Sequence, residues 1–374
     1  MIRRCSRCLM VNLRPDTEFL DSVCSGCVNY ERRSQINWAE RKETLLRILE
    51  SAPKNDSGFD VIVPSSGQKD STYQVLRVLE LGARPLVVTA TTCMLTPIGR
   101  ANIDNLSRYA STVEITPDRT VRAKLNRIGL ELVGDLSVAE HWLIHALPWR
   151  AARDFGIPTI MYGEVGPVEY GGPLDLAETQ RMTRRFVAEF GGNLGLRPAD
   201  LVGQYGLRRE DMALYQLPPQ EDTDKINAYF LGSFYPWNSH KNAQMSVKAG
   251  MMVPDEPPSI ANWWTPENID NFQTGIHDWF GAVKYSYGRL CAQISVDIRY
   301  GLISREEAAT IVRERDCVFP EYYMGMHYTK ILEHIELPEP RFWELTCQYA
   351  NKALFDISSG RPVMKPEVWE ASFA

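Results

Sequence analysis

The chain has 374 residues, of which 44% are hydrophobic and 24% are charged, and its formal net charge is −6. This is the composition of an ordinary soluble globular protein, which excludes a largely disordered chain. Lysine and arginine are scattered instead of clustered, which argues against nucleic acid as a partner. No apolar run approaches the roughly 20 residues that a membrane span needs, and the first residues do not form a secretory signal, so we expect a cytoplasmic protein.

Four cysteines near the N-terminus are spaced as metal ligands. Cys5 and Cys8 form one C-x2-C pair, and Cys24 and Cys27 form a second pair after fifteen intervening residues. This spacing lets two turns present four thiolates tetrahedrally to Zn²⁺. Disulfides are the alternative, and the expected reducing compartment disfavours them. Because four cysteines leave no position for a water, we predict a structural zinc that orders a zinc-ribbon-like segment over residues 1–35.

The rest of the chain alternates between helical and extended patterns. Residues 36–52 have helical periodicity and end at PKNDSG, so we place a helix and a linker at 36–56. Strands are then predicted at 59–64, 84–90, 112–117 and 157–163, and helices at 70–81, 98–110, 118–132 and 138–155. This alternation predicts an α/β domain over 57–235, with a parallel sheet covered by helices on both faces. We expect residues 236–374 to form a mainly helical region that contacts substrate or a partner.

A polar stretch, PSSGQKDST over residues 64–72, directly follows the first predicted strand. In parallel sheets, ligands bind at the carboxyl ends of the strands. A glycine-containing loop that leads into a helix presents unpaired N–H groups and the positive end of the helix dipole, and the serine hydroxyls and Lys69 add donors and charge. The stretch therefore predicts an anion site, although an ordinary capped helix with a polar first turn is the alternative. It does not match the Walker A motif G-x4-G-K-[ST].

The same stretch resembles the PP-loop, S-G-G-x-D-S, of the ATP pyrophosphatases. Gln68 stands where that motif has its second glycine. If position 68 required a positive φ, a glutamine there would cost roughly 1 kcal/mol and weaken or alter ATP binding. The resemblance implies a PP-loop (HUP-like) domain that uses ATP and Mg²⁺. The residues expected to bind the nucleotide are Ser66, Gly67, Gln68, Lys69, Asp70, Ser71 and Thr89.

Motifs along nearly the whole chain resemble those of the N-acetyl sugar amidotransferases, PP-loop enzymes of surface-polysaccharide (LPS O-antigen) biosynthesis. They are the two CxxC pairs, SGQKDSTYQ, IGRANIDNL, VRAKLNRIGLELVGDLSVAEH, YGEVGPVEYGGP, YPWNSHKNA and KYSYGR…DIRYGLISREEA. The resemblance implies that the protein converts the acetamido group of a nucleotide-linked N-acetyl sugar into an acetamidino group. ATP would activate the amide oxygen, ammonia would attack, and AMP and pyrophosphate would leave.

The resemblance also implies roles for individual residues. The residues expected to be catalytic are Lys69, Asp70, Glu164 and Glu169. The two glutamates follow another predicted strand and would bind Mg²⁺, steer ammonia or accept its proton, with a solvated loop carboxylate as the alternative for either one. The candidates for substrate contacts are Arg100, Asn102, Lys284 and Arg289, for which an ordinary exposed helix face is the alternative.

The chain lacks the sequence features of a built-in glutaminase. Ile2 stands where a nucleophilic cysteine would follow the initiator methionine, and no cysteine lies in a G-x-C-x-G sequence. The resemblance therefore implies a separate class I glutaminase subunit that supplies ammonia, with a barrel protein as a further candidate partner. Two other functions stay open. One is a PP-loop tRNA-modifying enzyme, which predicts a basic surface, and the other is a zinc-ribbon binding protein with an impaired loop, for which Gln68 is the evidence.

Overall fold

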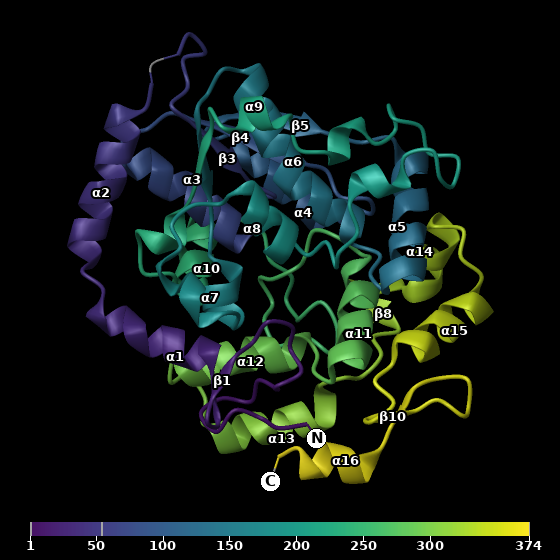
Figure 1. Cartoon of the computed structure of the whole chain (residues 1–374). Helices are drawn as coiled ribbons and strands as arrows, with labels where there is room; N and C mark the ends of the chain where they lie inside the picture. Colours follow the sequence, from purple (N-terminus) through teal and green to yellow (C-terminus); the bar gives the residue numbers. More distant parts are fainter. Residues whose placement is uncertain (1, 54, 374) are drawn as a thin grey trace.

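The computed structural model describes residues 2–53 and 55–373. It has an α/β fold with a parallel five-stranded sheet, a four-cysteine segment at the N-terminal end and a helical C-terminal region (Figure 1). The strands of the central sheet are β3 (Val61–Pro64), β4 (Pro85–Ala90), β5 (Ser111–Ile115), β6 (Thr159–Tyr162) and β7 (Asn227–Phe230). The predicted α/β fold is thereby confirmed.

The strand order of the sheet is β5-β4-β3-β6-β7, and every neighbouring pair is parallel. The chain therefore builds the sheet outward from β3 in one direction, returns, and continues from β6 in the other. The switch point lies between β3 and β6, and the loops that leave these two strands diverge there. In open α/β sheets this divergence opens a crevice in which ligands bind.

Helices cover both faces of the sheet because the apolar side chains of its strands point alternately to either side. Ile62 packs in one hydrophobic cluster with α6 (Val138–Asp154), whereas Val61 and Val63 pack in another with α3 (Lys69–Glu80). Helix α10 (Ser239–Lys248) lies against α3 on that second side. These contacts fix the start of α3 relative to the strand before it.

The other helices of the first two thirds of the chain agree only in part with the predicted pattern. Three of them were predicted: α2 (Trp38–Ser51), α4 (Pro97–Leu106) and α5 (Arg119–Val133). Four short helices were not predicted: α1 (Ser25–Arg32), α7 (Gly166–Tyr170), α8 (Arg184–Phe190) and α9 (Gln220–Thr223). Helix α4 ends four residues before the predicted position 110, at Leu106. The short edge strand β7 carries no strong extended pattern and was not predicted.

The C-terminal region is mainly helical, as predicted. Its helices are α11 (Thr274–Tyr285), α12 (Arg289–Arg299), α13 (Arg305–Arg315), α14 (Tyr328–His334), α15 (Glu339–Tyr349) and α16 (Pro366–Ala371). Three two-stranded antiparallel pairs complete the fold: β1 (Phe19–Leu20) with β2 (Val23–Cys24), β8 (Tyr322–Tyr323) with β9 (Met326–His327), and β10 (Phe355–Asp356) with β11 (Val363–Met364).

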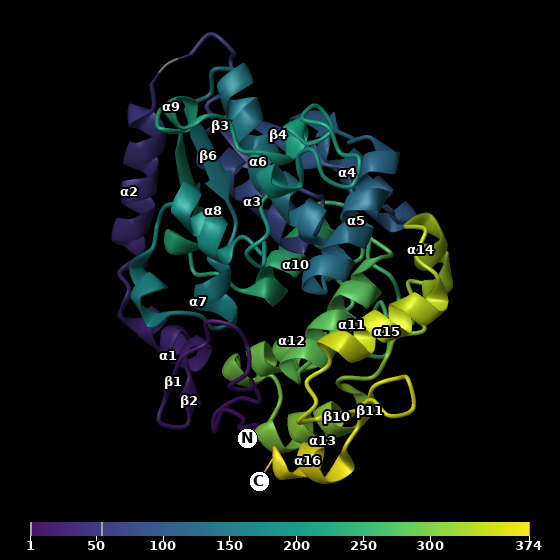
Figure 2. The same ribbon diagram turned by 45° about the vertical axis from the view of Figure 1, so that its right-hand side comes forward.

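The N-terminal segment shares a hydrophobic core with the C-terminal region. Ile2, Leu9 and Val11 belong to the same buried cluster as the apolar faces of α11, α12 and α15. The guanidinium of Arg4 lies 4.0 Å from the ring centre of Phe373. Both ends of the chain accordingly lie together in Figures 1 and 2. Among the helices that the structure describes, none combines the length and the apolar character needed to cross a membrane.

Candidate active site

The loop between β3 and α3 depends on one glycine. Gly67 has a φ of 77°, and a Cβ atom at this position would lie 2.5 Å from the carbonyl carbon of Asn102. Both the backbone conformation and the close approach therefore require glycine. Gln68, in contrast, has a φ of −85° and extended backbone geometry. The condition under which glutamine would strain this loop is thus not met, because the residue with positive φ is Gly67.

The first turn of α3 leaves donors free for an anion. The N–H of Thr72 makes the first helical hydrogen bond, to the carbonyl of Gln68 at 2.8 Å. The N–H groups of Lys69, Asp70 and Ser71 therefore have no partner within the helix, and they lie at its positive end. The arrangement is that of a phosphate-binding helix terminus.

Lys69 is buried at this turn and paired with two carboxylates. Its side chain forms an ion pair with Asp70, and its Nζ lies 3.3 Å from Oε2 of Glu267. Burial by itself would lower the pKa of Lys69, but the charges of Asp70 and Glu267 outweigh this effect and raise the pKa well above its usual value. Lys69 is therefore a fixed positive charge beside the open N–H groups.

Two side chains of helix α10 form hydrogen bonds with the first turn of α3. The side-chain amide of Asn242 donates to Asp70 Oδ1 at 2.8 Å, and the hydroxyl of Ser246 donates to the carbonyl of Lys69 at 2.6 Å. Both α10 residues are buried. Their side chains keep the carboxylate of Asp70 and the backbone of Lys69 in place, so α10 positions the loop without belonging to it.

Glu164 follows β6 and thus reaches the switch point from the other strand. Burial raises the pKa of Glu164, and the nearby charge of Asp70 raises it further, to about 7. A carboxyl group with this pKa is divided between its two protonation states near neutral pH. It can therefore accept or give a proton in a reaction at neutral pH.

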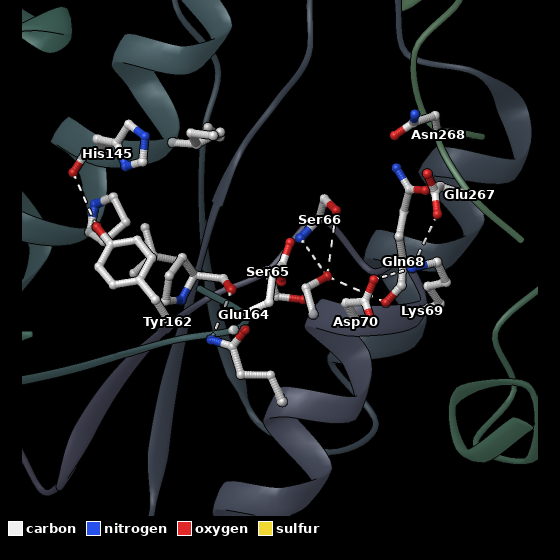
Figure 3. A pocket seen from close by; sticks show the side chains of 18 of the residues that line it. Ser65, Ser66, Gln68, Lys69, Asp70, His145, Tyr162, Glu164, Glu267 and Asn268 are labelled. Atoms are coloured by element: carbon white, nitrogen blue, oxygen red, sulfur yellow. Dashed lines mark hydrogen bonds and ion pairs between the residues drawn. The ribbon is translucent and has the colours of Figure 1, made fainter. Parts of the chain in front are cut away.

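The first turn of α3 and Glu164 line one cavity of about 440 Å³ (Figure 3). The predicted site residues that it brings together are Ser66, Gln68, Lys69, Asp70, Ser71, Glu164 and Arg289. The lining also includes the apolar side chains of Val88, Ala90 and Leu147 and the ring of Tyr162, which could contact a flat ring. In Figure 3, Glu267 and Asn268 lie beside Gln68 and Lys69, whereas His145 and Tyr162 lie on the opposite side of the loop.

Several residues of this cavity were not predicted. Glu267, Asn268 and His145 line it, but none of them stands in a motif that marks it as functional. Tyr162 also lines it and begins the motif YGEVGPVEYGGP, but no role was predicted for it. Glu267 is a single acidic residue in an irregular loop almost 200 residues after Lys69. No periodicity or spacing could have assigned it to this site.

The other predicted residues lie outside this cavity. Glu169 forms an ion pair with Arg33 of the N-terminal region, and its carbonyl accepts a hydrogen bond of 2.5 Å from Arg299. Arg100 lies on the surface of α4 and pairs with Glu114. The geometry thus gives Glu169 and Arg100 structural partners and no contact with the cavity.

Asn102 and Thr89 are buried next to the loop between β3 and α3. The side chain of Asn102 forms two hydrogen bonds with the backbone of Met252, at 2.9 and 2.7 Å. The hydroxyl of Thr89 donates to the carbonyl of Ser65 at 2.7 Å. Lys284 lines a second cavity, which it shares with Arg289.

The four N-terminal cysteines form a cluster that fits a metal ion. Their sulfurs lie within 4.8 Å of one another, with Cys5 and Cys27 3.8 Å apart and Cys8 and Cys24 3.6 Å apart. Four sulfurs about 2.3 Å from a tetrahedral Zn²⁺ would be about 3.8 Å apart. The four cysteines are free thiols without disulfides, and all are buried. They can therefore hold a metal such as zinc at a closed site.

The cysteine cluster is packed against the C-terminal region. Nε of Arg305, at the start of α13, donates to the carbonyl of Cys8 at 3.0 Å. Ala292 of α12 lies in the same buried cluster as the four cysteines. A metal at this site would therefore fix the N-terminal segment against α12 and α13.

The parallel sheet and the phosphate-type loop at its switch point are the architecture of α/β nucleotide-binding proteins. Residues 266–366, a little over a quarter of the chain, match the family described as LPS biosynthesis protein WbpG-like, C-terminal domain. The chain thus carries the C-terminal domain of the WbpG-like family of LPS biosynthesis proteins, which confirms the resemblance to the N-acetyl sugar amidotransferases. This domain contributes Glu267, Asn268 and Arg289 to the cavity. No curated protein matches the chain.

Proposed function

We propose that the protein is an AMP-forming amidotransferase that converts the acetamido group of a nucleotide-linked N-acetyl sugar into an acetamidino group. One observation carries the proposal: a single cavity joins the loop after β3 to residues of the WbpG-like domain. The loop is suited to phosphate, and the domain belongs to a family of LPS biosynthesis. The two reactants would meet where these parts face each other.

The reaction would proceed in two steps. In the first, the amide oxygen attacks the α-phosphorus of ATP, the bond from this phosphorus to the bridging oxygen breaks, and pyrophosphate leaves. In the second, ammonia attacks the imidate carbon, and AMP leaves with the former amide oxygen. The product contains N–H in place of that oxygen, and two protons are released. Splitting the substitution in this way replaces a poor leaving group with a good one.

The loop would bind the departing pyrophosphate. The free N–H groups at the start of α3, the hydroxyl of Ser66 and the charge of Lys69 would stabilise the negative charge that develops there. Mg²⁺ in such sites usually takes one or two carboxylates besides phosphate and water, and Asp70 fits that role. When bound, the ion would neutralise phosphate charge. Asn242 would keep Asp70 in position.

Glu164 would act as the general base that accepts a proton from the incoming ammonia. Its raised pKa of about 7 lets the carboxylate accept a proton as the new C–N bond forms. It lies on the same cavity as Asp70 and Lys69, so the proton would be taken up close to the phosphate groups. Glu169 forms an ion pair with Arg33 instead, so it would take no part in this proton transfer.

Ammonia would come from a separate class I glutaminase. Outside the four-cysteine cluster, Cys93 is the cysteine that most resembles a nucleophile, because its Sγ lies 3.0 Å from Nε2 of His334. Burial raises the pKa of the Cys93 thiol to about 12, however, so that at neutral pH it is not a thiolate. Cys93 also does not line the cavity of the loop.

The proposal is tested by following the amide oxygen. The protein is incubated with Mg-ATP, ammonium salt and a panel of nucleotide-linked N-acetyl sugars whose acetamido oxygen is ¹⁸O. We expect AMP and pyrophosphate, a sugar product lighter by about one mass unit, and the label in AMP. Formation of ADP, or label that stays in the sugar, would contradict the mechanism. The variants Asp70→Ala and Ser71→Ala should each slow pyrophosphate release by ~10²-fold or more.

A further inference from the structure

A second cavity of about 210 Å³ adjoins the first, and Arg289 lines both. The walls of this second cavity come from distant parts of the chain. Lys284 and Tyr287 come from the end of α11 and the turn after it, Asp278 comes from α11 itself, and Arg14 comes from the N-terminal segment. In Figure 2 the N-terminal segment lies beside α12, close to α11.

Two cations of this second cavity have no carboxylate partner. Lys284 Nζ donates to the carbonyl of Val133 at 3.1 Å, and Arg14 donates to the carbonyl of Gly171 at 3.2 Å and to the hydroxyl of Tyr287 at 3.4 Å. Within residues 2–53 and 55–373, neither side chain forms an ion pair, because its partners are neutral. Both side chains are half-buried, and a half-buried cation whose partners are neutral can still form a charge-assisted hydrogen bond to an anion.

The other charged groups of the second cavity are already paired. Nη2 of Arg289 lies 2.8 Å from Asp278 Oδ1, and Nδ1 of His277 lies 2.8 Å from Asp135 Oδ1. These two pairs use both carboxylates that line the cavity. Arg14 and Lys284 therefore leave an excess of positive charge there.

The second cavity also offers a free acceptor. Oδ2 of Asp278 is buried and has no hydrogen-bond partner in the described part of the chain, and the side chain of Asp278 is only 8% exposed. Leaving such an oxygen unpaired costs about 1–3 kcal/mol, which a donor on a ligand would recover. A hydroxyl or amide N–H of a sugar is such a donor, and the ring of Tyr287 offers an apolar surface beside it.

We propose that this second cavity binds the anionic part of the acceptor, with a carboxylate or phosphate group held between Arg14 and Lys284. At about 210 Å³ it is smaller than the roughly 300–1,000 Å³ of pockets that enclose a whole ligand, so it suits one sugar ring or one phosphate group. Arg289 connects this subsite to the cavity of the loop. The identification of the ligand as the acceptor rests on the proposed function, whereas anion binding by the cavity does not.

The proposal gives the N-terminal segment a second role. Arg14 lies between the two cysteine pairs in sequence and is anchored to the carbonyl of Gly171. The segment would thus supply one of the two anion-binding side chains, besides holding a metal.

Binding is measured in the absence of ATP and ammonia, so that it does not depend on catalysis. The full-length protein is titrated calorimetrically with UDP-glucuronate, UDP-N-acetylglucosamine and free glucuronate. We expect at least one of these anions to bind, and Arg14→Gln and Lys284→Gln each to weaken its binding by ~10-fold or more. If only the two uronates lose affinity, the bound group is a carboxylate. If the two nucleotide sugars lose affinity and free glucuronate does not, the bound group is a phosphate.

Matched controls remove a charge outside both cavities. The control variants are Arg3→Gln and Lys42→Gln. Arg3 lies in the same N-terminal segment as Arg14, Lys42 lies on α2, and both side chains are exposed. They should bind like the wild type, and all four variants should keep their thermal unfolding curves and zinc content. The proposal is overturned if no anion binds the wild type, if Arg14→Gln and Lys284→Gln bind as well as the controls, or if an ATP analogue displaces the anion completely. A protein that binds the anion but forms no AMP would contradict the proposed function alone.

Discussion

Replacing Glu164 with glutamine should change how the stability of the protein depends on pH. The substitution keeps the size of the side chain and removes its ionisation. Burial and the charge of Asp70 raise the pKa of Glu164 from 4.5 to about 7 in the folded protein. Between these two pH values the folded state binds one proton more than the unfolded state. The free energy of unfolding of the wild type should therefore fall as the pH rises through this range.

The size of the effect follows from the same values. A rise in pKa from 4.5 to about 7 corresponds to about 3 kcal/mol for a fully shielded carboxyl group. Because the side chain of Glu164 is only half-buried, solvent screens part of this penalty, and ~1–2 kcal/mol is the expected difference. At pH 5 the wild-type side chain is mostly protonated and resembles glutamine. At pH 8 it is charged, so Glu164→Gln should be the more stable protein by this amount.

The assay is urea denaturation of both proteins at pH 5, 6, 7 and 8 without nucleotide. Other groups that titrate in this range are shared by the two proteins and cancel in the difference. A difference that stays constant from pH 5 to 8, or that grows in favour of the wild type, would refute the assignment of a raised pKa. It would also remove the reason for giving Glu164 the proton of ammonia.

Three further predictions concern the loop, the cysteine cluster and the source of ammonia. Gly67→Ala should destabilise the protein by ~2 kcal/mol or more and prevent ATP-analogue binding, because position 67 has a positive φ and contacts the backbone of Asn102. Gln68→Gly should lower the free energy of unfolding, measured by thermal denaturation, by only ~0.5–1 kcal/mol. A larger loss of stability for Gln68→Gly than for Gly67→Ala would contradict the assignment of the positive φ to position 67. Elemental analysis should find about one Zn²⁺ per chain, and a chelator should lower the unfolding temperature; finding iron instead would be inconsistent with a zinc site. The purified protein should use ammonium salt but not glutamine until a glutaminase is added, and glutamine-dependent product from the protein alone would exclude that division of labour.

The sheet and its loop could be predicted because their signals are local. Strands β3, β4 and β6 are short apolar runs bounded by turn residues, and the polar stretch after β3 stands out against them. Once the fold is a parallel sheet, the carboxyl ends of β3 and β6 must lie on the same edge. The residues that follow these strands, Lys69 and Glu164, were therefore predictable as neighbours.

The rest of the site depends on contacts between distant segments. Asn242 contacts Asp70 across 172 residues, and Glu267 reaches Lys69 from an irregular loop. Sequence periodicity describes only the residues within a few turns of one another, so it could not pair these groups. The conformation at Gln68 could not be predicted for a similar reason. Which residue of a loop takes a positive φ is decided by the packing around it, here by Asn102 against Gly67.

The docking of the cysteine cluster on α12 and α13 sets an order of events during synthesis. The carbonyl of Cys8 is bonded by Arg305, which follows it by 297 residues. At ~5–20 residues per second, the ribosome delivers that partner roughly 15 to 60 seconds after the first cysteines. During this interval the surface that finally buries the thiols does not yet exist. Metal capture by the nascent chain would protect them from oxidation, and the supply of the ion during translation would then govern the yield of active protein.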